Sequence, residues 1–240
     1  MKHLGRLFAA ALIATSLPVM AKSSNMDSVT FSSGGKTIGM KVFAAGAANS
    51  PAILVLHGAG GVDPGNRYVG QLAAAVAANG YSTFVVEYFD RTGTTYASDA
   101  VIQKNFTAWL ETIADATTYI AERSDIDPGR IGTFGYSLGG YLAVAHAARD
   151  PRVRATVELA GGIDSSYSSE VRRLPPLLIV HGEEDQRVPF DRGLELEKFA
   201  QRFGSPVETQ FFPNERHILS PAAAFQALAR ALTFFGNHLK

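Results

Sequence analysis

The sequence predicts a single-domain α/β fold built on a mostly parallel, eight-stranded sheet flanked by helices. From residue 29 onward, short apolar runs alternate with segments of helical period. Several of these runs are continuously apolar, which is typical of parallel strands that are buried on both faces. No linker, repeat or low-complexity stretch interrupts the pattern, and 240 residues fit one α/β unit.

The elements follow in order along the chain. Each expected strand is an apolar or alternating run bounded by turn residues; the strands are 28–32, 37–43, 52–56, 82–87, 131–135, 155–159, 177–180 and 208–212. The helical segments are 68–78, 106–122, 138–148, 192–203 and 222–238. Ser220-Pro221 caps the last helix, with proline in the first turn. The connection 161–175 is too short for a large lid domain, so an open site is expected.

The first 21 residues stand apart from this pattern. Lys2 and Arg6 precede an apolar run, and Val19-Met20-Ala21 supplies the small residues that a signal peptidase recognises. We therefore expect a signal peptide over 1–21, a domain over 22–240, and a periplasmic or secreted protein without stable membrane association after cleavage. An uncleaved anchor is the alternative, but the run contains Pro18 and is shorter than the roughly 20 residues that span a bilayer.

Composition excludes several functions. Two of the 22 basic residues lie in the leader, so the remaining chain is slightly acidic and does not predict a nucleic-acid partner. Cysteine is absent, which rules out disulfides and a thiol nucleophile. The six histidines form no closely spaced pair typical of a zinc site, so neither a metal nor another cofactor is expected.

A nucleophile candidate lies between an expected strand and the next helix. Gly135-Tyr136-Ser137-Leu138-Gly139 has the pattern of a nucleophile elbow, a sharp turn that exposes a serine hydroxyl at the carboxyl edge of a sheet. The flanking glycines avoid collisions at this turn, and Gly140 lets the helix approach the sheet. The alternative is a glycine-rich turn that binds an anion at the helix N-terminus.

A serine nucleophile needs a base and an orienting acid. Of the downstream histidines, only His217 lies in a loop between the last strand and the last helix; His146 has the neighbours of a packed residue, His181 closes a buried strand and His238 is near the C-terminus. Asp185 follows the strand 177–180 and is the preferred acid. Asp164 is a weaker candidate, and Glu183 and Glu184 have the character of solvated charges.

The oxyanion hole requires two backbone N–H donors. Leu138 supplies one at the start of its helix. The other is assigned to Ala59, because His57-Gly58-Ala59-Gly60-Gly61 directly follows an expected strand and its glycines allow the backbone to turn toward a bound carbonyl. An ordinary tight turn is the alternative for this segment.

Together these motifs resemble the dienelactone hydrolase family of α/β hydrolases over nearly all of the chain after the leader. The matching segments, in the family's order, are His57-Gly58-Ala59-Gly60-Gly61, Tyr88-Phe89-Asp90-Arg91, Gly135-Tyr136-Ser137-Leu138-Gly139-Gly140, His181-Gly182-Glu183-Glu184-Asp185 and His217. The resemblance implies the α/β-hydrolase fold and the same triad, and makes Arg91 a candidate contact for a substrate carboxylate. Tyr136 is a second candidate substrate-binding residue. Serine replaces the cysteine nucleophile of the namesake enzymes, and Gly58 replaces their oxyanion-loop glutamate, which is more similar to general esterases and peptidase-type hydrolases.

The sequence thus predicts an exported serine hydrolase that cleaves a small carboxylic ester or related acyl substrate through Ser137, His217 and Asp185. Two alternatives remain: a peptidase-type hydrolase of short or acylated peptides, and a non-catalytic binding protein on the hydrolase scaffold. The segments 88–105 and 161–175 are expected to shape the pocket. Tyr88, Phe89, Tyr96 and Tyr167 either form an aromatic wall there or pack at the surface or in the core.

Overall fold

One sheet organises the chain. The structure, a computed structural model, describes residues 26–62, 67–164, 168 and 171–240. Its strands are β1 (Met26–Ser33), β2 (Lys36–Phe43), β3 (Ser50–Leu56), β4 (Ser82–Val86), β5 (Ile126–Tyr136), β6 (Val153–Leu159), β7 (Leu177–Gly182) and β8 (Val207–Phe212). Within these residues they form an eight-stranded sheet in the order β1-β2-β4-β3-β5-β6-β7-β8. Pairing is antiparallel for β1 with β2 and β2 with β4, and parallel from β4 to β8. The predicted fold class is confirmed.

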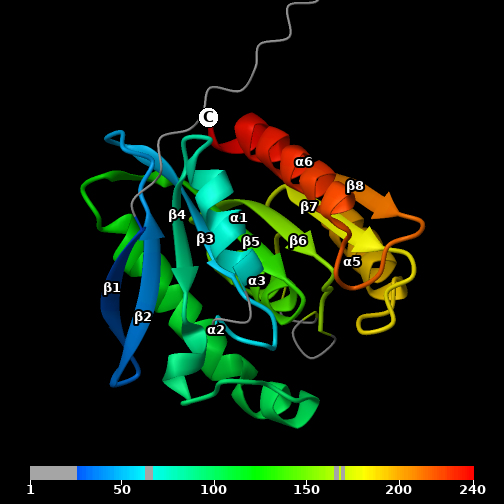
Figure 1. The fold of residues 1–240 in the computed structure, drawn as a ribbon, viewed down its shortest axis with the longest axis horizontal. Helices are drawn as coiled ribbons and strands as arrows, with labels where there is room; N and C mark the ends of the chain where they lie inside the picture. Colours follow the sequence, from blue (N-terminus) through cyan, green and yellow to red (C-terminus); the bar gives the residue numbers. More distant parts are fainter. Residues whose placement is uncertain (1–25, 63–66, 165–167, 169–170) are drawn as a thin grey trace, which may run out of the picture.

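Helices cover both faces of the sheet (Figure 1). They are α1 (Arg67–Ala77), α2 (Asp99–Ala121), α3 (Leu138–Arg149), α5 (Asp191–Arg202) and α6 (Pro221–Leu239). Helices α1 and α6 pack on one face, and α2, α3 and α5 pack on the other, so apolar side chains fill the space on either side of the parallel strands. The parallel strands are therefore buried on both faces, as their continuous apolar runs indicate.

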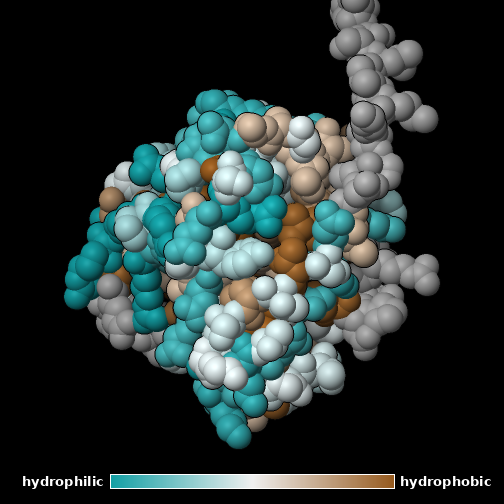
Figure 2. Space-filling model, turned by 90° about the vertical axis from the view of Figure 1, so that its left-hand side faces the viewer, coloured by the Kyte–Doolittle hydropathy of each residue, from teal (hydrophilic) through white to brown (hydrophobic). Residues whose placement is uncertain are grey.

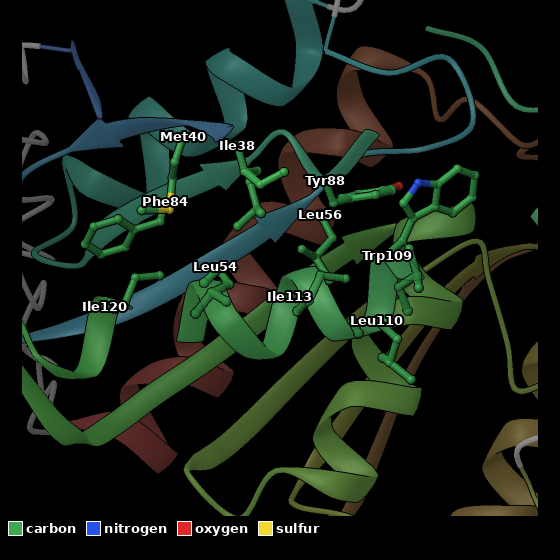
Figure 3. Close-up of a cluster of buried hydrophobic side chains, with 14 of the residues drawn as sticks. Ile38, Met40, Leu54, Leu56, Phe84, Tyr88, Trp109, Leu110, Ile113 and Ile120 are labelled. Carbon is green, nitrogen blue, oxygen red and sulfur yellow. The ribbon is translucent and has the colours of Figure 1, made fainter. Parts of the chain in front are cut away.

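The core beneath α2 contains several large aromatic residues, among them Phe84, Tyr88 and Trp109. Figure 3 shows side chains of β2, β3 and β4 packed against Trp109 and the aliphatic residues of α2. Trp109 is fully buried, and its indole N–H donates to the hydroxyl of Thr92 at 2.9 Å. Tyr88 packs edge-on against the same indole at 5.8 Å. This packing fixes the segment that follows β4.

Two element boundaries differ from the sequence-based expectation. Helix α2 begins at Asp99 rather than residue 106, because Ser98 caps it by accepting a hydrogen bond from the backbone N–H of Val101. Strand β5 begins at Ile126 rather than residue 131, because Ile126 pairs with Ser50 across a register shift. The segment 88–105 thus consists of a 3-10 turn, η1 (Tyr88–Arg91), a connection over 92–98 and the first turns of α2.

The open edge of the sheet at β1 is mainly polar. Figure 2 views the molecule from this side, where hydrophilic and intermediate residues dominate and hydrophobic residues form only a narrow strip. Such an edge discourages pairing with another chain. Among the residues that the structure describes, no helix combines the length and the apolarity needed to cross a bilayer.

Candidate active site

The segments that follow three strands of the sheet bring Ser137, Asp185 and His217 together. Ser137 follows β5, Asp185 follows β7 and His217 follows β8. Because these strands are parallel, their carboxyl ends lie at one edge of the sheet, and the loops that follow them meet there. The hydroxyl of Ser137 donates to His217 Nε2 at 2.9 Å, and His217 Nδ1–H donates to Asp185 Oδ2 at 2.7 Å. The three residues form one unbroken chain of hydrogen bonds.

Ser137 lies at a strained turn. Its φ of 55° and ψ of −120° fall outside the regions that residues with a side chain prefer, at a cost on the order of 1–3 kcal/mol. The chain is very close-packed here: a Cβ at Gly135 would lie 2.0 Å from the carbonyl oxygen of Gly139. A Cβ at Gly139 would lie 2.2 Å from the carbonyl oxygen of Leu56 on β3. Glycine is therefore required on both sides of the serine, as the elbow motif predicts.

Asp185 is held by its own loop. Its Oδ1 accepts hydrogen bonds from the backbone N–H groups of Arg187 at 2.8 Å and Val188 at 2.9 Å, which leaves Oδ2 directed at His217. The buried His181 donates through Nε2–H to the carbonyl oxygen of Val188 at 3.0 Å, and the same nitrogen lies 3.3 Å from Asp185 Oδ2. Burial lowers the pKa of His181, so the ring is neutral. His181 thus supports the acid loop.

Tyr136 supports the base. Its hydroxyl donates to the carbonyl oxygen of His217 at 3.2 Å, and the two rings lie 5.2 Å apart. Burial, with the negative charge of Asp185, raises the pKa of Tyr136 to about 12, so its hydroxyl remains a donor at neutral pH. Sequence reasoning assigned Tyr136 to substrate binding; the contacts of its hydroxyl place it on the loop of His217.

The predicted oxyanion loop lies directly against the nucleophile. A Cβ at Gly58 would lie 3.3 Å from the Cβ of Ser137, so the loop backbone packs closely against the serine and a side chain here would crowd it. On its buried side, the hydroxyl of Tyr88 donates to the carbonyl oxygen of His57 at 2.6 Å, and His57 Nδ1–H donates to that of Gly58 at 2.8 Å. The position of Ala59 is fixed by its carbonyl oxygen, which accepts a hydrogen bond from the N–H of Ala97 at 2.9 Å.

Leu138 opens helix α3, and the first N–H groups of a helix have no partner within it. The Leu138 N–H is therefore oriented beside Ser137 together with the positive end of the helix dipole. The loop of Gly58 and the first turn of α3 thus both adjoin the serine. This arrangement can accommodate negative charge on an oxygen bound between them.

Arg91 is not part of this cluster. Its guanidinium packs on the β1–β2 turn, where a Cβ at Gly34 would overlap it, and Nη2 lies 3.5 Å from Glu111 Oε2. Strand β2 is three places from β5 in the sheet, which corresponds to about 14 Å at the usual strand spacing. Sequence similarity gives the position of a residue in a motif but not the direction of its side chain, and here that direction is away from Ser137.

The described members of the possible aromatic wall pack in the core or lie at the surface instead. Tyr88 and Phe89 are buried in the core and pack with His57 and Trp109. Tyr96 is 63% exposed and immediately precedes Ala97, the residue bonded to the oxyanion loop. Tyr167 lies outside the described residues. Among the described members of this group, Tyr96 is the one at the surface.

The other sequence candidates do not join the triad. His146 is buried, and its Nε2 bonds to the hydroxyl of Thr117 at 2.9 Å, as expected of a structural residue. Asp164, the alternative acid, is exposed, and His217 Nδ1 is taken by Asp185. Among the described residues, no cluster of three or more His, Asp or Glu side chains could hold a metal ion.

Sequence reasoning missed one residue near the elbow. Glu158 on β6 is fully buried, and its Oε1 accepts a hydrogen bond from the backbone N–H of Gly161. Burial, opposed by that hydrogen bond and reinforced by the charge of Asp185, raises the pKa of Glu158 to about 8. A charged residue type within an otherwise apolar strand was the signal that could have revealed it.

Comparison with known proteins identifies the family of this chain. The model of the dienelactone hydrolase family matches residues 40–239. The chain belongs to the dienelactone hydrolase family. The resemblance inferred from the motifs is confirmed, and the family membership makes the protein a hydrolase.

Individual relatives of this dienelactone hydrolase family member include esterases and peptidases. The esterase YjfP of Escherichia coli is 25% identical over 233 residues, which cover 79% of this chain and 89% of that protein. The acylamino-acid-releasing enzyme of Sus scrofa is 24% identical over 185 residues, 59% of this chain but only 25% of that enzyme. The solved structure of the dienelactone hydrolase-like promiscuous phosphotriesterase P91, from metagenomic libraries, superposes with a TM-score of 0.78 at 13% identity, covering 90% of this chain and 99% of that one. This last likeness shows the shared fold.

Proposed function

We propose that this protein is an exported serine hydrolase that cleaves carboxylic esters or related acyl bonds through an acyl-enzyme intermediate. The observation that carries the proposal is the hydrogen-bonded chain from Ser137 through His217 to Asp185 at a strained elbow. A serine that is merely structural does not need a positive φ, an adjacent base and a base-orienting carboxylate at once.

The first half of the reaction forms the acyl-enzyme. Ser137 Oγ attacks the acyl carbon while His217 Nε2 takes the hydroxyl proton, and the oxygen of the carbonyl becomes negative between the N–H groups of Ala59 and Leu138. Asp185 stabilises the imidazolium through Nδ1–H. When the tetrahedral intermediate collapses, the alcohol leaves with the proton from His217, and Ser137 remains esterified.

The second half repeats these steps with water. His217 removes a proton from a water molecule, whose oxygen attacks the acyl carbon, and the same two N–H groups accommodate the charge. Collapse returns the proton to Ser137 Oγ and releases the carboxylic acid. Apart from the substrate and water, both halves use only side chains and backbone groups of this chain. Ser137 is 8% exposed and the side chain of His217 is 19% exposed, so both reach solvent.

Export is proposed from the first 21 residues, which lie outside the described part of the structure. Their basic start, apolar run and small residues are those of a cleavable signal peptide. The measurement is the mass and N-terminal sequence of protein recovered from the periplasm or medium of an expressing bacterium. A mature N-terminus at Lys22 is the expected result, and retention of Met1 in the membrane fraction would contradict it.

The test of the chemistry is hydrolysis of p-nitrophenyl esters of increasing acyl length by the protein comprising residues 22–240. We expect turnover of short-chain esters, its loss in Ser137→Ala, and one equivalent of covalent label from an organophosphate in the active protein alone. Turnover that persists in the variant would refute the assignment of Ser137. No turnover and no labelling would favour a binding protein on the hydrolase scaffold.

A second candidate is a peptidase-type activity on short or acylated peptides. The similarity to the acylamino-acid-releasing enzyme favours it, although this chain spans only a quarter of that enzyme. Comparing kcat/KM for an acyl-alanine p-nitroanilide with that for the p-nitrophenyl ester of the same acyl-alanine separates the peptidase from the esterase. A higher value on the anilide would favour the peptidase.

A further inference from the structure

Glu158 is a buried carboxyl group that the hydrolysis steps do not use. Its side chain extends from β6, and the residue has no exposed surface. Oε1 accepts a hydrogen bond from Gly161 N–H, whereas Oε2 is buried with no hydrogen-bond partner among the described residues. A carboxylate in this position would lack most of the donors that an anion needs, so the neutral acid is the favoured form.

The carboxyl group lies beneath the nucleophile elbow. Oε1 is 3.0 Å from the position of a Cβ at Gly140, in the first turn of α3. A Cβ at Gly161 would lie 2.7 Å from the same oxygen and 2.9 Å from the carbonyl oxygen of Ser137. Glu158 therefore fills the space between the first turn of α3 and the turn after β6, in contact with both.

The turn after β6 is itself under constraint. Ala160 has a φ of 53°, although it carries a side chain, and its N–H donates to the carbonyl oxygen of Val180 at 2.9 Å. The carbonyl oxygen of Leu159 accepts from Ser137 N–H at 2.9 Å. The bond from Gly161 to Glu158 closes this turn, so the backbone of the nucleophile is held partly through Glu158.

The charges around Glu158 determine what its ionisation does. Asp185, in the loop after β7, and Tyr141, on α3, interact electrostatically with Glu158. The neighbours in the sheet, Gly135 of β5 and Ile179 of β7, carry no charge. Because the pKa of Glu158 is raised to about 8, it is neutral at pH 7 and becomes a second anion beside Asp185 in mildly alkaline solution.

We propose that Glu158 is a positioning residue that supports hydrolysis only as the neutral acid. As the neutral acid it holds the turn beneath Ser137. As a carboxylate it opposes the negative charge that develops between Ala59 and Leu138 and weakens the positive potential at the start of α3. This inference rests on the proposed hydrolase function. Its chemical consequence is an alkaline limit to activity that originates outside the triad.

The test compares the wild-type protein with Glu158→Gln. The amide keeps an oxygen for the Gly161 N–H but cannot ionise. Above about pH 8 we expect kcat/KM of the wild type for p-nitrophenyl acetate, corrected for spontaneous hydrolysis, to fall on the order of tenfold, whereas the variant stays level. Glu122→Gln, the same change at an exposed residue at the end of α2, should follow the wild type.

Thermal unfolding gives a readout that needs no activity. A carboxyl whose pKa is raised on folding stabilises the protein fully below its unfolded pKa, near 4.5, and that stabilisation is lost as pH rises toward about 8. The wild-type Tm should therefore fall across this window relative to that of Glu158→Gln. If the amide variant does not fold, Glu158→Met provides an uncharged side chain of similar volume for both measurements.

The outcomes separate the two proposals. Hydrolysis that depends on Ser137, with parallel alkaline profiles in the wild type and the variant, overturns the role of Glu158 and leaves the hydrolase function standing. Parallel unfolding profiles likewise overturn it, because the carboxyl would then not be held neutral. If the wild type hydrolyses no ester while the unfolding profiles diverge, the proposed function fails although Glu158 titrates as described.

Discussion

Replacing Asp185 with asparagine changes one hydrogen bond of the triad while leaving the loop around it intact. The asparagine oxygen can still accept from the N–H groups of Arg187 and Val188, 2.8 and 2.9 Å from Oδ1 in the native protein. The amide nitrogen then faces His217 Nδ1 across the present 2.7 Å contact. Two donors cannot share that contact, so the imidazole must place its proton on Nε2 and can no longer accept one from Ser137.

The expected loss follows from this change of tautomer. Such a substitution in a serine triad lowers kcat by roughly 10⁴-fold, which corresponds to about 5 kcal/mol of transition-state stabilisation. The assay is p-nitrophenyl ester hydrolysis, together with the rate of organophosphate labelling, which should fall in parallel. Because both backbone hydrogen bonds to this side chain persist, Tm should change little.

Asp164→Asn is the matched control, since Asp164 was the alternative acid and is exposed. It should keep nearly full activity. The reasoning is refuted if Asp185→Asn retains more than about a tenth of wild-type kcat, or if Asp164→Asn loses as much as Asp185→Asn. A Tm drop of many degrees in Asp185→Asn would show instead that the loop had collapsed.

Two further predictions concern stability. Gly139→Ala should abolish soluble folding or lower Tm sharply, because its Cβ would lie 2.2 Å from the carbonyl oxygen of Leu56. Gly70→Ala in α1, where a Cβ has open space, should instead raise the free energy of unfolding by about 0.5–1 kcal/mol. Equal Tm values for the two variants would contradict the packing argument. Acidification should destabilise the fold, because burial lowers the pKa of His57 and of His146 to about 4. Below pH 6.5, the pKa of histidine in the unfolded chain, these two rings bind protons in the unfolded state but stay neutral in the folded state. Each ring therefore lowers the free energy of unfolding by about 2 kcal/mol at pH 5 relative to pH 8. Unfolding profiles from pH 8 to 5 should be shallower for His146→Leu than for the wild type, and identical slopes would exclude its contribution.

Much of the fold could be predicted from the sequence because hydrophobic periodicity reports burial, and burial decides these elements. The start of α2 was placed late because its first turns contribute little to the core, so the apolar pattern is weak there even though Ser98 supplies a cap. The early start of β5 was missed because Asp127-Pro128-Gly129 has the composition of a turn. Pairing of Ile126 with Ser50, a contact between distant parts of the chain, overrides that local preference.

The candidate site, too, could be predicted from the sequence only in part. Ser137, Asp185 and His217 could be located because each follows a strand, and parallel strands gather their carboxyl ends at one edge. The direction of Arg91 could not be predicted, since it depends on the space that Gly34 leaves in a hairpin outside the matched motif. Glu158 was missed because nothing local shows which turn its carboxyl group meets.

The triad is assembled from residues that are far apart along the chain. Ser137 and His217 are separated by 80 positions, and three crossovers of the sheet lie between β5 and β8. A chain that has emerged only as far as α5 contains the serine and its acid but no base. Catalytic activity should therefore appear only when the last strand and α6 have packed against the sheet. The first turnover then reports that folding is complete.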